Sequence, residues 1–482
     1  MFGPFKRKNL RIAQLCQIVY TPLFVYRFGA AGAALAMFLG MSWLYACGDK
    51  DLYENILTSY GVLPFRFPFV DTSGALAAWE CARQGVDVIV SDPCDVLQRG
   101  YTYSPLWMAA AGIPLGVANT MAVGWTLDLA FLLSLSLLPA PRRPLELVLT
   151  LAATLSTMVA FALERANPDI LLFLLALATG LLTGYPLFMR LFGYFLGLAA
   201  ALLKYYPIMI LVVASRERAS VFCLVGLVVL GTLAVFWIGY HTEIARGLPN
   251  IAHGPYNTDL FSAQNLPFLL GEAIANATAS PFVGHVAAGG LYAILVGGCI
   301  ATLRRLLRFP GLRASLASLP RLDRVLLVIG SAVIVGCFLA GQSIGYRGVF
   351  LLLVMPGLLG ISRTSVRKLW FLGLSTSVVV VLLMWGECFR LALYGVLEHS
   401  GISDSLASEV EIQFWLFREL CWWWTVAFML AVLADFLRDT PIVRGALSLF
   451  DHSMVRVRCP GVENPVQRRD LGPRGERGSR YC

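Results

Sequence analysis

Apolar runs of about 20 residues recur along nearly the whole chain, and this feature restricts its fold more than any other. Runs of this length fit membrane-spanning helices, in which every backbone polar group is hydrogen-bonded internally. Only 14% of the 482 residues are charged, against about 25% in ordinary globular domains. So few charges cannot cover a water-facing surface. A soluble protein is therefore excluded, and we predict an all-α, polytopic transmembrane bundle.

Lys and Arg gather at both termini and in the short connectors between apolar runs, the distribution that marks cytoplasmic segments. This placement accounts for the formal net charge of +9 without nucleic acid. We predict a basic cytoplasmic N-terminus over 1–23, a bundle of about twelve crossings over 24–440, and a basic, partly disordered cytoplasmic tail over 441–482. Large extracytoplasmic loops are then expected at 47–104 and 241–284.

Two segments decide the number of crossings. Residues 105–117 are too short to span, and 191–214 are predicted to cross twice, as two short helices broken at Pro207. The alternative is one crossing for each segment. It would put the connectors around Arg142 and Arg190 outside, against the positive-inside rule. No internal repeat is detectable in the sequence, which disfavours transporters built from duplicated halves.

Eleven cysteines are spread singly along the chain, without the CxxC or Cys/His spacing that would hold a metal. We therefore predict no metal site. Cys81 and Cys94 share the first outer loop, where an oxidising exterior would allow a disulfide between them.

Asp71 is the candidate general base. It follows an aromatic run in the first outer loop, where a carboxylate close to the membrane surface suits removal of a proton from a hydroxyl. The alternative is a helix N-cap, because Asp71, Thr72 and Ser73 precede a helix-like stretch. Asp92 and Asp95, on either side of Pro93, fit a turn instead.

Several charged residues lie beside or within apolar runs, where an ionised side chain costs about 2.5–3.5 kcal/mol. Glu164 and Arg165 end one run, and they either pair with each other or face an aqueous cavity. Asn167 or Asp169 is expected to cap the next helix, with Pro168 in its first turn. For Asp169 we expect this structural role.

Arg347 and Lys204, with Arg99 as a weaker candidate, are predicted to bind a phosphate. Arg binds phosphate oxygens through two parallel N–H groups, and Lys acts as a point charge. The alternative is that these cations only extend to the membrane surface. The loop of His253 offers the donors and acceptors that sugar hydroxyls need, although any wet loop offers them too. The residues predicted to bind substrate or line its cavity are Tyr103, Glu164, Arg165, Asn167, His253 and Tyr346.

In order and spacing these motifs resemble the C-type (GT-C) superfamily of integral membrane glycosyltransferases. In particular they resemble glycosyltransferase family 87, known for polyprenyl-phosphate-mannose-dependent mannosyltransferases. The resemblance covers residues 45–440, and its motifs are Asp71, Tyr103 with Pro105 and Leu106, Glu164-Arg165-x-Asn167-x-Asp169, Lys204-x-Tyr206-Pro207 and Tyr346-Arg347. Two departures are Ala166, where many members carry glycine, and the lack of an Asp-x-Asp pair near Asp71. The second departure argues against a metal.

The resemblance implies a multi-pass enzyme of the inner or plasma membrane that serves the cell envelope. It would move a mannose-like hexose from a polyprenyl-phosphate sugar to a lipid or glycan acceptor on the extracytoplasmic face. Asp71 would act as base with inversion, the cations would hold the donor phosphate, and no cofactor beyond the donor is expected. The implied partners are the donor, the acceptor and the bilayer. The alternatives are a transporter or flippase of a lipid-linked or anionic substrate, and a polymerase or ligase of polyprenyl-linked glycans.

Overall fold

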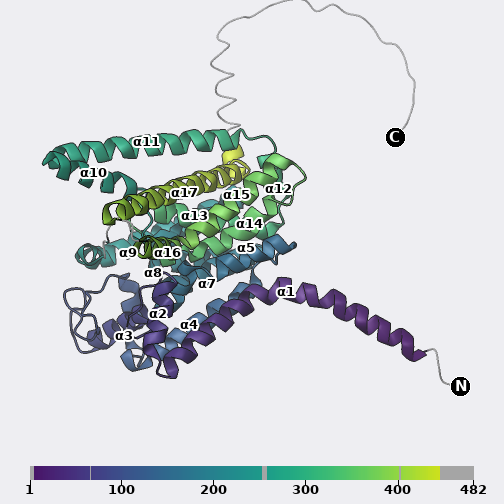
Figure 1. The fold of residues 1–482 in the computed structure, drawn as a ribbon, viewed down its shortest axis with the longest axis horizontal. Coiled ribbons are helices and arrows are strands. Elements are labelled where there is room, and N and C mark those ends of the chain that lie inside the picture. Colours follow the sequence, from purple (N-terminus) through teal and green to yellow (C-terminus); the bar gives the residue numbers. More distant parts are fainter. Residues whose placement is uncertain (1–4, 66, 252–253, 255–257, 401–402, 446–482) are drawn as a thin grey trace, which may run out of the picture.

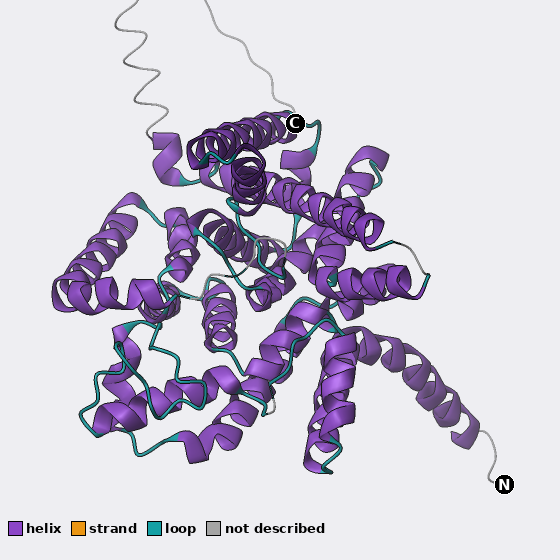
Figure 2. Ribbon diagram, turned by 60° about the vertical axis from the view of Figure 1, so that its left-hand side comes forward, coloured by secondary structure: helices purple, strands orange, loops and turns teal. Residues whose placement is uncertain are grey.

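The computed structural model describes residues 5–65, 67–251, 254, 258–400 and 403–445, and over these ranges the chain is helical (Figures 1 and 2). The described part contains no β-strand, only an isolated antiparallel bridge between Phe261 and Ser343. The all-α prediction is confirmed. The tail beyond residue 445 and His253 lie outside the described residues.

Within the described ranges, eight segments are helical, long and apolar enough to cross a membrane. The chain thus has the architecture of a multi-pass membrane protein, as predicted. The segments are Phe24–Ala46 in α1 (Phe5–Ala46), Val117–Leu137 around α4 (Thr120–Ser134), Pro144–Arg165 formed by α5 (Pro144–Thr154) and α6 (Thr157–Arg165), Ala219–Asn250 around α9 (Ala219–Gly247), α11 (Pro281–Leu307), α13 (Arg321–Ala340), α15 (Arg367–Met384) and Ser405–Arg438 in α17 (Asp404–Arg438).

Four shorter apolar helical segments lie between the long ones. They are α7 (Pro168–Leu182), α8 (Leu187–Leu203), the 3₁₀ helix η4 (Tyr206–Arg216), and η6 (Gly345–Phe350) continued by α14 (Leu351–Ile361). Two helices occupy 191–214, as predicted. The break lies at Lys204 and Tyr205 rather than at Pro207, which is in the first turn of η4. Residues 105–117 hold only the short 3₁₀ helix η1 (Pro105–Gly112).

The predicted outer loops contain helices of their own. The first loop holds α2 (Lys50–Ser59) and α3 (Val70–Arg83). The second is shorter than predicted, because α9 continues to Gly247 and α10 (Asn265–Thr278) packs against α11. The close approach of these two helices depends on small residues: a Cβ on Gly271 would lie 2.8 Å from the carbonyl oxygen of Gly284.

The core lies around α13, which packs against α14, η4, α7 and α17. Of the most apolar 18-residue stretch in α13, 78% is buried. The corresponding stretch is 11% buried in α11, and none of it is buried in α9. The outer helices therefore present apolar side chains such as Leu230, Trp237 and Ile294 to their surroundings. This is the pattern expected of helices that face lipid.

The two ends of the bundle carry different helices (Figure 1). α2 and α3 lie at one end, and α12 (Leu312–Ser318) lies at the other, with the N-terminus of α1 beyond it. We call these the α3 end and the α12 end. Near the α3 end, α16 (Gly386–His399) packs against α17.

Candidate functional site

Asp71 lies in the first turn of α3, where the chain is fixed to the turn between α6 and α7. The N-cap of α3 is Phe69, which adopts a left-handed conformation with φ of 64° and donates its N–H to the Glu164 carbonyl at 2.7 Å. The Thr72 hydroxyl donates to the Ala166 carbonyl at 2.6 Å. The N-cap hypothesis for Asp71 is therefore wrong, because Phe69 occupies that position.

The Asp71 carboxylate is held by two donors instead. Asn167 Nδ2 donates to Oδ2 at 2.6 Å, and Arg99 Nη1 donates to Oδ1 at 3.3 Å. The side chain remains 12% exposed. A carboxylate that is oriented by an amide and a guanidinium, yet still reachable, has the geometry that a general base needs.

The turn between α6 and α7 aligns the polar groups around Asp71. Ala166 ends α6 with φ of 40°, a left-handed conformation that glycine adopts without steric cost. Asn167 then caps α7, as predicted, by accepting the Asp169 N–H at 2.8 Å. One amide side chain thus caps a helix through its oxygen and binds Asp71 through its nitrogen.

Asp169 is a fully buried carboxylate that joins three other segments of the chain. Its Oδ1 accepts from Lys204 Nζ at 2.6 Å and from the Tyr206 hydroxyl at 2.7 Å, and its Oδ2 lies 3.5 Å from Arg347 Nε. The expectation that Asp169 serves only at a helix terminus is wrong. Two cations with no acidic neighbour in sequence need an anion from elsewhere in the fold, and Asp169 supplies it.

The predicted phosphate-binding cations lie in this cluster. The side chains of Lys204 and Arg347 are 13% and 20% exposed, and Arg347 Nη1 also donates to Ser343 Oγ at 2.9 Å. Burial lowers the pKa of the Lys204 ammonium below its ordinary value, while the adjacent Asp169 carboxylate opposes this shift. One carboxylate shared between two cations leaves a local charge of about +1.

Aromatic rings flank the cations. The Tyr103 and Tyr346 ring centroids lie 5.6 and 5.8 Å from Lys204 Nζ, and the Tyr206 ring lies 5.3 Å from the Arg347 guanidinium. Burial raises the pKa of Tyr103 well above its ordinary value, and Asp71 raises it further. Tyr103 therefore stays protonated and offers a hydroxyl group beside the carboxylate.

Arg99 belongs to the same site, attached from the loop that follows α3. Its Nε donates to Asp95 at 2.8 Å, and its Nη2 donates to the Val70 carbonyl at 2.9 Å. Asp95 therefore positions Arg99 and also forms part of the turn that begins at Asp92. Because Asp95 and Asp71 both contact Arg99, its charge is more fully balanced than that of Lys204 and Arg347.

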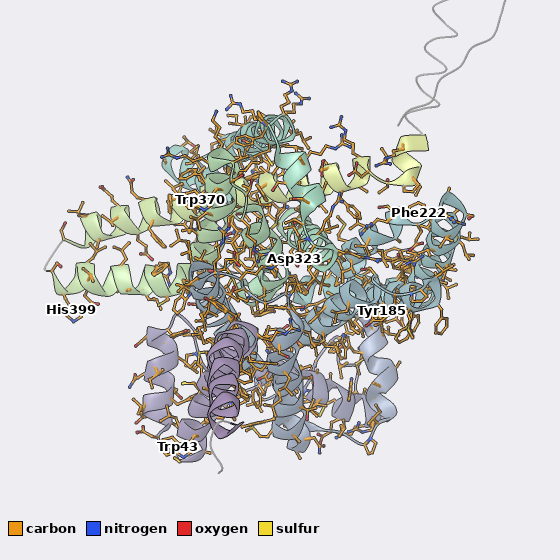
Figure 3. The ribbon with its side chains drawn as sticks, turned by 90° about the vertical axis from the view of Figure 1, so that its right-hand side faces the viewer. Trp43, Tyr185, Phe222, Asp323, Trp370 and His399 are labelled. Carbon is orange, nitrogen blue, oxygen red and sulfur yellow. A yellow bond between two sulfur atoms is a disulfide. The ribbon has the colours of Figure 1, made fainter. Side chains whose placement is uncertain are left out.

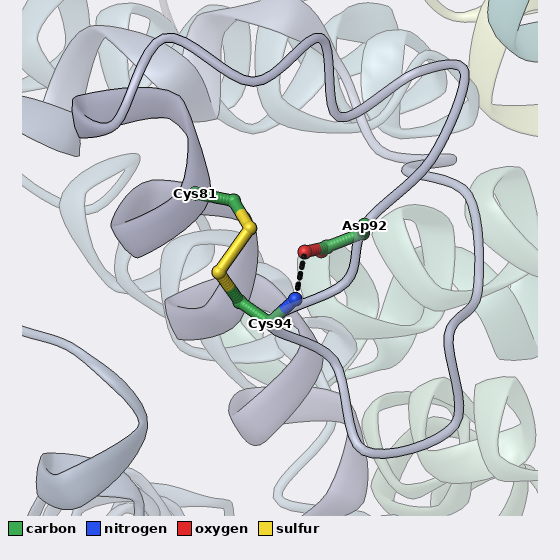
Figure 4. Close-up of side chains that lie close together, drawn as sticks. All are labelled: Cys81, Asp92 and Cys94. Atoms are coloured by element: carbon green, nitrogen blue, oxygen red, sulfur yellow. Dashed lines mark hydrogen bonds between the residues drawn. A yellow bond between two sulfur atoms is a disulfide. The ribbon is translucent and has the colours of Figure 1, made fainter.

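The loop carrying Arg99 is closed by a disulfide between Cys81 and Cys94, which confirms the pairing considered from the sequence. Asp92 lies beside it and accepts the Cys94 N–H at 3.2 Å (Figure 4). Burial raises the pKa of Asp92, and the neighbouring Asp95 raises it further. Asp92 is thus a turn residue, as predicted.

Glu164 and Arg165 pair with each other at 2.9 Å, which was one of the two roles considered for them. The Arg165 guanidinium lies over the rings of Phe65 and Phe161, at 4.2 and 5.0 Å from their centroids. Their side chains are 2% and 8% exposed, so they do not face a wide aqueous space. They stabilise the wall of the site.

An apolar cavity of about 190 Å³ adjoins the site between α1, α2, α4 and α6. Phe69 and Glu164 line it, and the hydrogen bond between their backbones fixes the start of α3, which carries Asp71. The remaining walls carry aromatic rings and flexible apolar side chains, among them Met37, Met41, Tyr45, Tyr53 and Trp125. The cavity has the lining expected for a hydrocarbon chain.

Two features of the described chain were missed at the sequence level. Asp128, in the middle of the α4 span, is fully buried, and neither carboxylate oxygen has a hydrogen-bond partner among the described residues. Its signal was a lone acidic residue within an apolar run. Arg418 and Glu419 form a buried pair at 3.2 Å in α17, where Arg418 also donates to the Leu260 carbonyl.

Among the predicted site residues, the structure brings together Asp71, Arg99, Tyr103, Asn167, Lys204, Tyr346 and Arg347. Glu164 and Arg165 lie against this cluster rather than in it. His253 falls outside the described residues. No family model matches the chain, and no match was found among curated proteins or solved structures.

Proposed function

We propose that this protein is an inverting membrane glycosyltransferase that transfers a hexose, mannose-like, from a polyprenyl-phosphate donor to a lipid or glycan acceptor. The observation that carries the proposal is that an accessible carboxylate, Asp71, lies near two cations, Lys204 and Arg347, which are paired with Asp169. A base and an anion-binding group are the two components that this reaction requires.

Charge matching favours a phosphodiester donor. A sugar linked to a polyprenyl phosphate carries a single negative charge, and Lys204, Arg347 and Asp169 together leave about one positive charge. As the bond to the sugar breaks, a second negative charge develops on the phosphate. Cations at that position stabilise the transition state more than the ground state and so lower the barrier.

Asp71 then has one role. It takes the proton from the acceptor hydroxyl while the sugar carbon gains oxocarbenium character, and attack from the face opposite the phosphate inverts the anomeric centre. Phosphate is a good leaving group, so no general acid is needed, in contrast to glycoside hydrolysis. The adjoining apolar cavity offers space for the hydrocarbon part of a lipid substrate.

The same proposal includes the C-type fold and its orientation. Eight long and four shorter apolar helical segments together would give the twelve crossings. With both termini cytoplasmic, the α3 end faces outward and the site lies at the extracytoplasmic surface of the membrane. This assignment follows from the basic connectors.

Asp71→Asn tests the proposed chemistry. Asparagine keeps the size of the side chain and can still accept from Asn167, but it cannot take a proton. Transfer from polyprenyl-phosphate mannose should fall by a factor on the order of 100 or more, with donor binding retained. Asp87→Asn is the matched control, because Asp87 lies in the same outer loop and its side chain is 51% exposed.

An active Asp71→Asn protein would remove Asp71 as the base. Normal elution and thermal unfolding of that variant would show that a loss of transfer does not come from misfolding. If the wild-type protein transfers no sugar from any polyprenyl-phosphate donor, the enzyme proposal fails as a whole.

Asp128 is the observation that favours a transporter, the alternative class. A buried acidic residue at mid-depth is typical of proton or ion pathways. The helix around it, α4, is continuous from Thr120 to Ser134, whereas transporter sites are commonly built on broken helices. Asp128→Asn should therefore leave sugar transfer in place, and loss of substrate movement in this variant alone would favour the transporter.

A further inference from the structure

A second cavity, with both polar and apolar lining, lies at the α12 end, away from the Asp71 site. It has a volume of about 480 Å³ and is formed by α12, by the connection from α14 to α15, and by the loop before α5. Figure 3 views the molecule from this side, with Asp323 near the centre. The cavity has no part in the proposed transfer reaction.

The floor of this cavity is a fixed ion-pair cluster. Arg363 donates through Nε and Nη2 to Glu146 at 3.0 and 2.9 Å, and its Nη1 lies 3.5 Å from Asp323. Glu146 also accepts the backbone N–H of Arg142 at 2.7 Å. The two carboxylates carry one negative charge more than Arg363 balances, and Asp323 also interacts electrostatically with Arg142. They therefore offset only one further cation around the cavity.

The rim of the cavity carries an excess of positive charge. The Arg142 side chain lines the cavity and is exposed, and it forms no salt bridge among the residues that the structure describes. Arg143 is also exposed and donates to the Arg363 carbonyl at 3.4 Å.

Two further cations, Arg367 and Lys368, begin α15 beside the lining residue Val366. Ser315, Ser318 and Thr364 add hydroxyl groups to the lining.

Apolar side chains border the same cavity. Val366 lines the cavity and is 51% exposed, and the buried side chains of Leu319 and Leu369 line its interior. Trp370 follows on α15 with 37% exposure (Figure 3). Tryptophan is enriched where a membrane protein meets the headgroup layer. A molecule bound in this cavity would therefore contact both arginine side chains and apolar side chains.

We propose that this cavity binds the phosphate headgroup of an anionic membrane lipid, with Arg142 as the principal contact. Basic pockets between helices at the cytoplasmic face are suited to such headgroups, because Arg binds phosphate oxygens through paired N–H groups. The apolar border selects a lipid over free phosphate. The site would stabilise the contact between the loop before α5 and the start of α15.

The test uses the purified full-length protein and native mass spectrometry with phosphatidylglycerol. Arg142→Gln should weaken phosphatidylglycerol binding about fivefold, the effect of one cation near an anionic surface. Arg142→Lys should retain most of the binding, because the charge remains. Arg305→Gln is the control, since Arg305 is an exposed arginine in the last turn of α11 and does not line the cavity.

Three outcomes would overturn the proposal: equal loss of phosphatidylglycerol in Arg142→Gln and Arg305→Gln, equal binding of phosphatidylcholine by the wild-type protein, or full competition by inorganic phosphate at the lipid concentration. The last outcome would indicate a site for a soluble phosphate. Because Arg142 is exposed, its substitution should leave the thermal unfolding of the lipid-free protein unchanged, so reduced binding is not explained by misfolding. Sugar transfer is not needed for this experiment.

Discussion

Asp169 occupies a position in which one carboxylate serves two cations and a tyrosine hydroxyl. A buried carboxylate without such partners would be strongly disfavoured, and so would either cation alone. The three charged groups therefore stabilise one another in the buried cluster. Their net charge of about +1 is what makes the cluster suitable for a phosphate rather than only for stability.

Arg347 offers a test of this charge. Arg347→Gln should raise the KM for the donor about tenfold or more, because a charge-assisted hydrogen bond is worth about 1.5–3 kcal/mol. Arg347→Lys should raise it less, since the fork geometry is lost but the charge is kept. Donor saturation curves for the two variants provide the measurement.

Arg246→Gln serves as the comparison, because it removes the same charge at a site outside the cluster. The Arg246 side chain is 49% exposed and pairs with Asp87. Donor saturation should be unchanged in this variant. If Arg347→Gln also leaves donor saturation unchanged, Arg347 does not touch the donor. Its role would then be confined to the ion pair with Asp169.

At the scale of elements, the first outer loop depends on its disulfide. The bridge between Cys81 and Cys94 joins the last turn of α3 to the loop that carries Asp95 and Arg99. The sequence separation is 13 residues, and closing a loop of 15 residues is worth roughly 3 kcal/mol. The bridge thus restrains the part of the chain that places Arg99 beside Asp71.

Cys81→Ser should therefore lower the thermal unfolding temperature and reduce transfer, because Arg99 loses its fixed position. Cys223→Ser, which removes an exposed free thiol in α9, is the control. Peptide mapping without reduction should recover a linked pair of peptides containing Cys81 and Cys94. Recovery of both as free thiols from an oxidising host would contradict the bridge.

For the whole molecule, the arrangement of charge predicts its orientation in the membrane. Arg142, Arg143 and Arg363 lie at the α12 end, while Asp71 and the disulfide loop lie at the α3 end. Reporter fusions after Arg143 and after Gly100 should therefore report opposite sides of the membrane, the first cytoplasmic. Localisation of both reporters on one side would refute the topology and, with it, the outward-facing site.

The sequence alone determined the class of fold, because the transfer of an apolar segment into lipid depends on that segment's own composition and length. It also determined which polar residues are costly in such a chain and therefore need a partner or a purpose. For this reason Lys204 and Arg347 could be selected as candidates before any contact between them was visible. The break between α8 and η4 was equally local, since proline near Lys204 disfavours a continuous helix.

The tertiary structure decided which of these groups meet. Asp71, Asn167, Lys204 and Arg347 come from four distant parts of the chain, and only helix packing places them in one cluster. The sequence-based interpretation assigned Asp169 to a helix cap because its nearest neighbours are cap residues, whereas its actual partners are 35 or more positions away. The position of Asp128 within an apolar run was visible in the sequence, but its complete burial without a hydrogen-bond partner among the described residues is a property of the packed bundle.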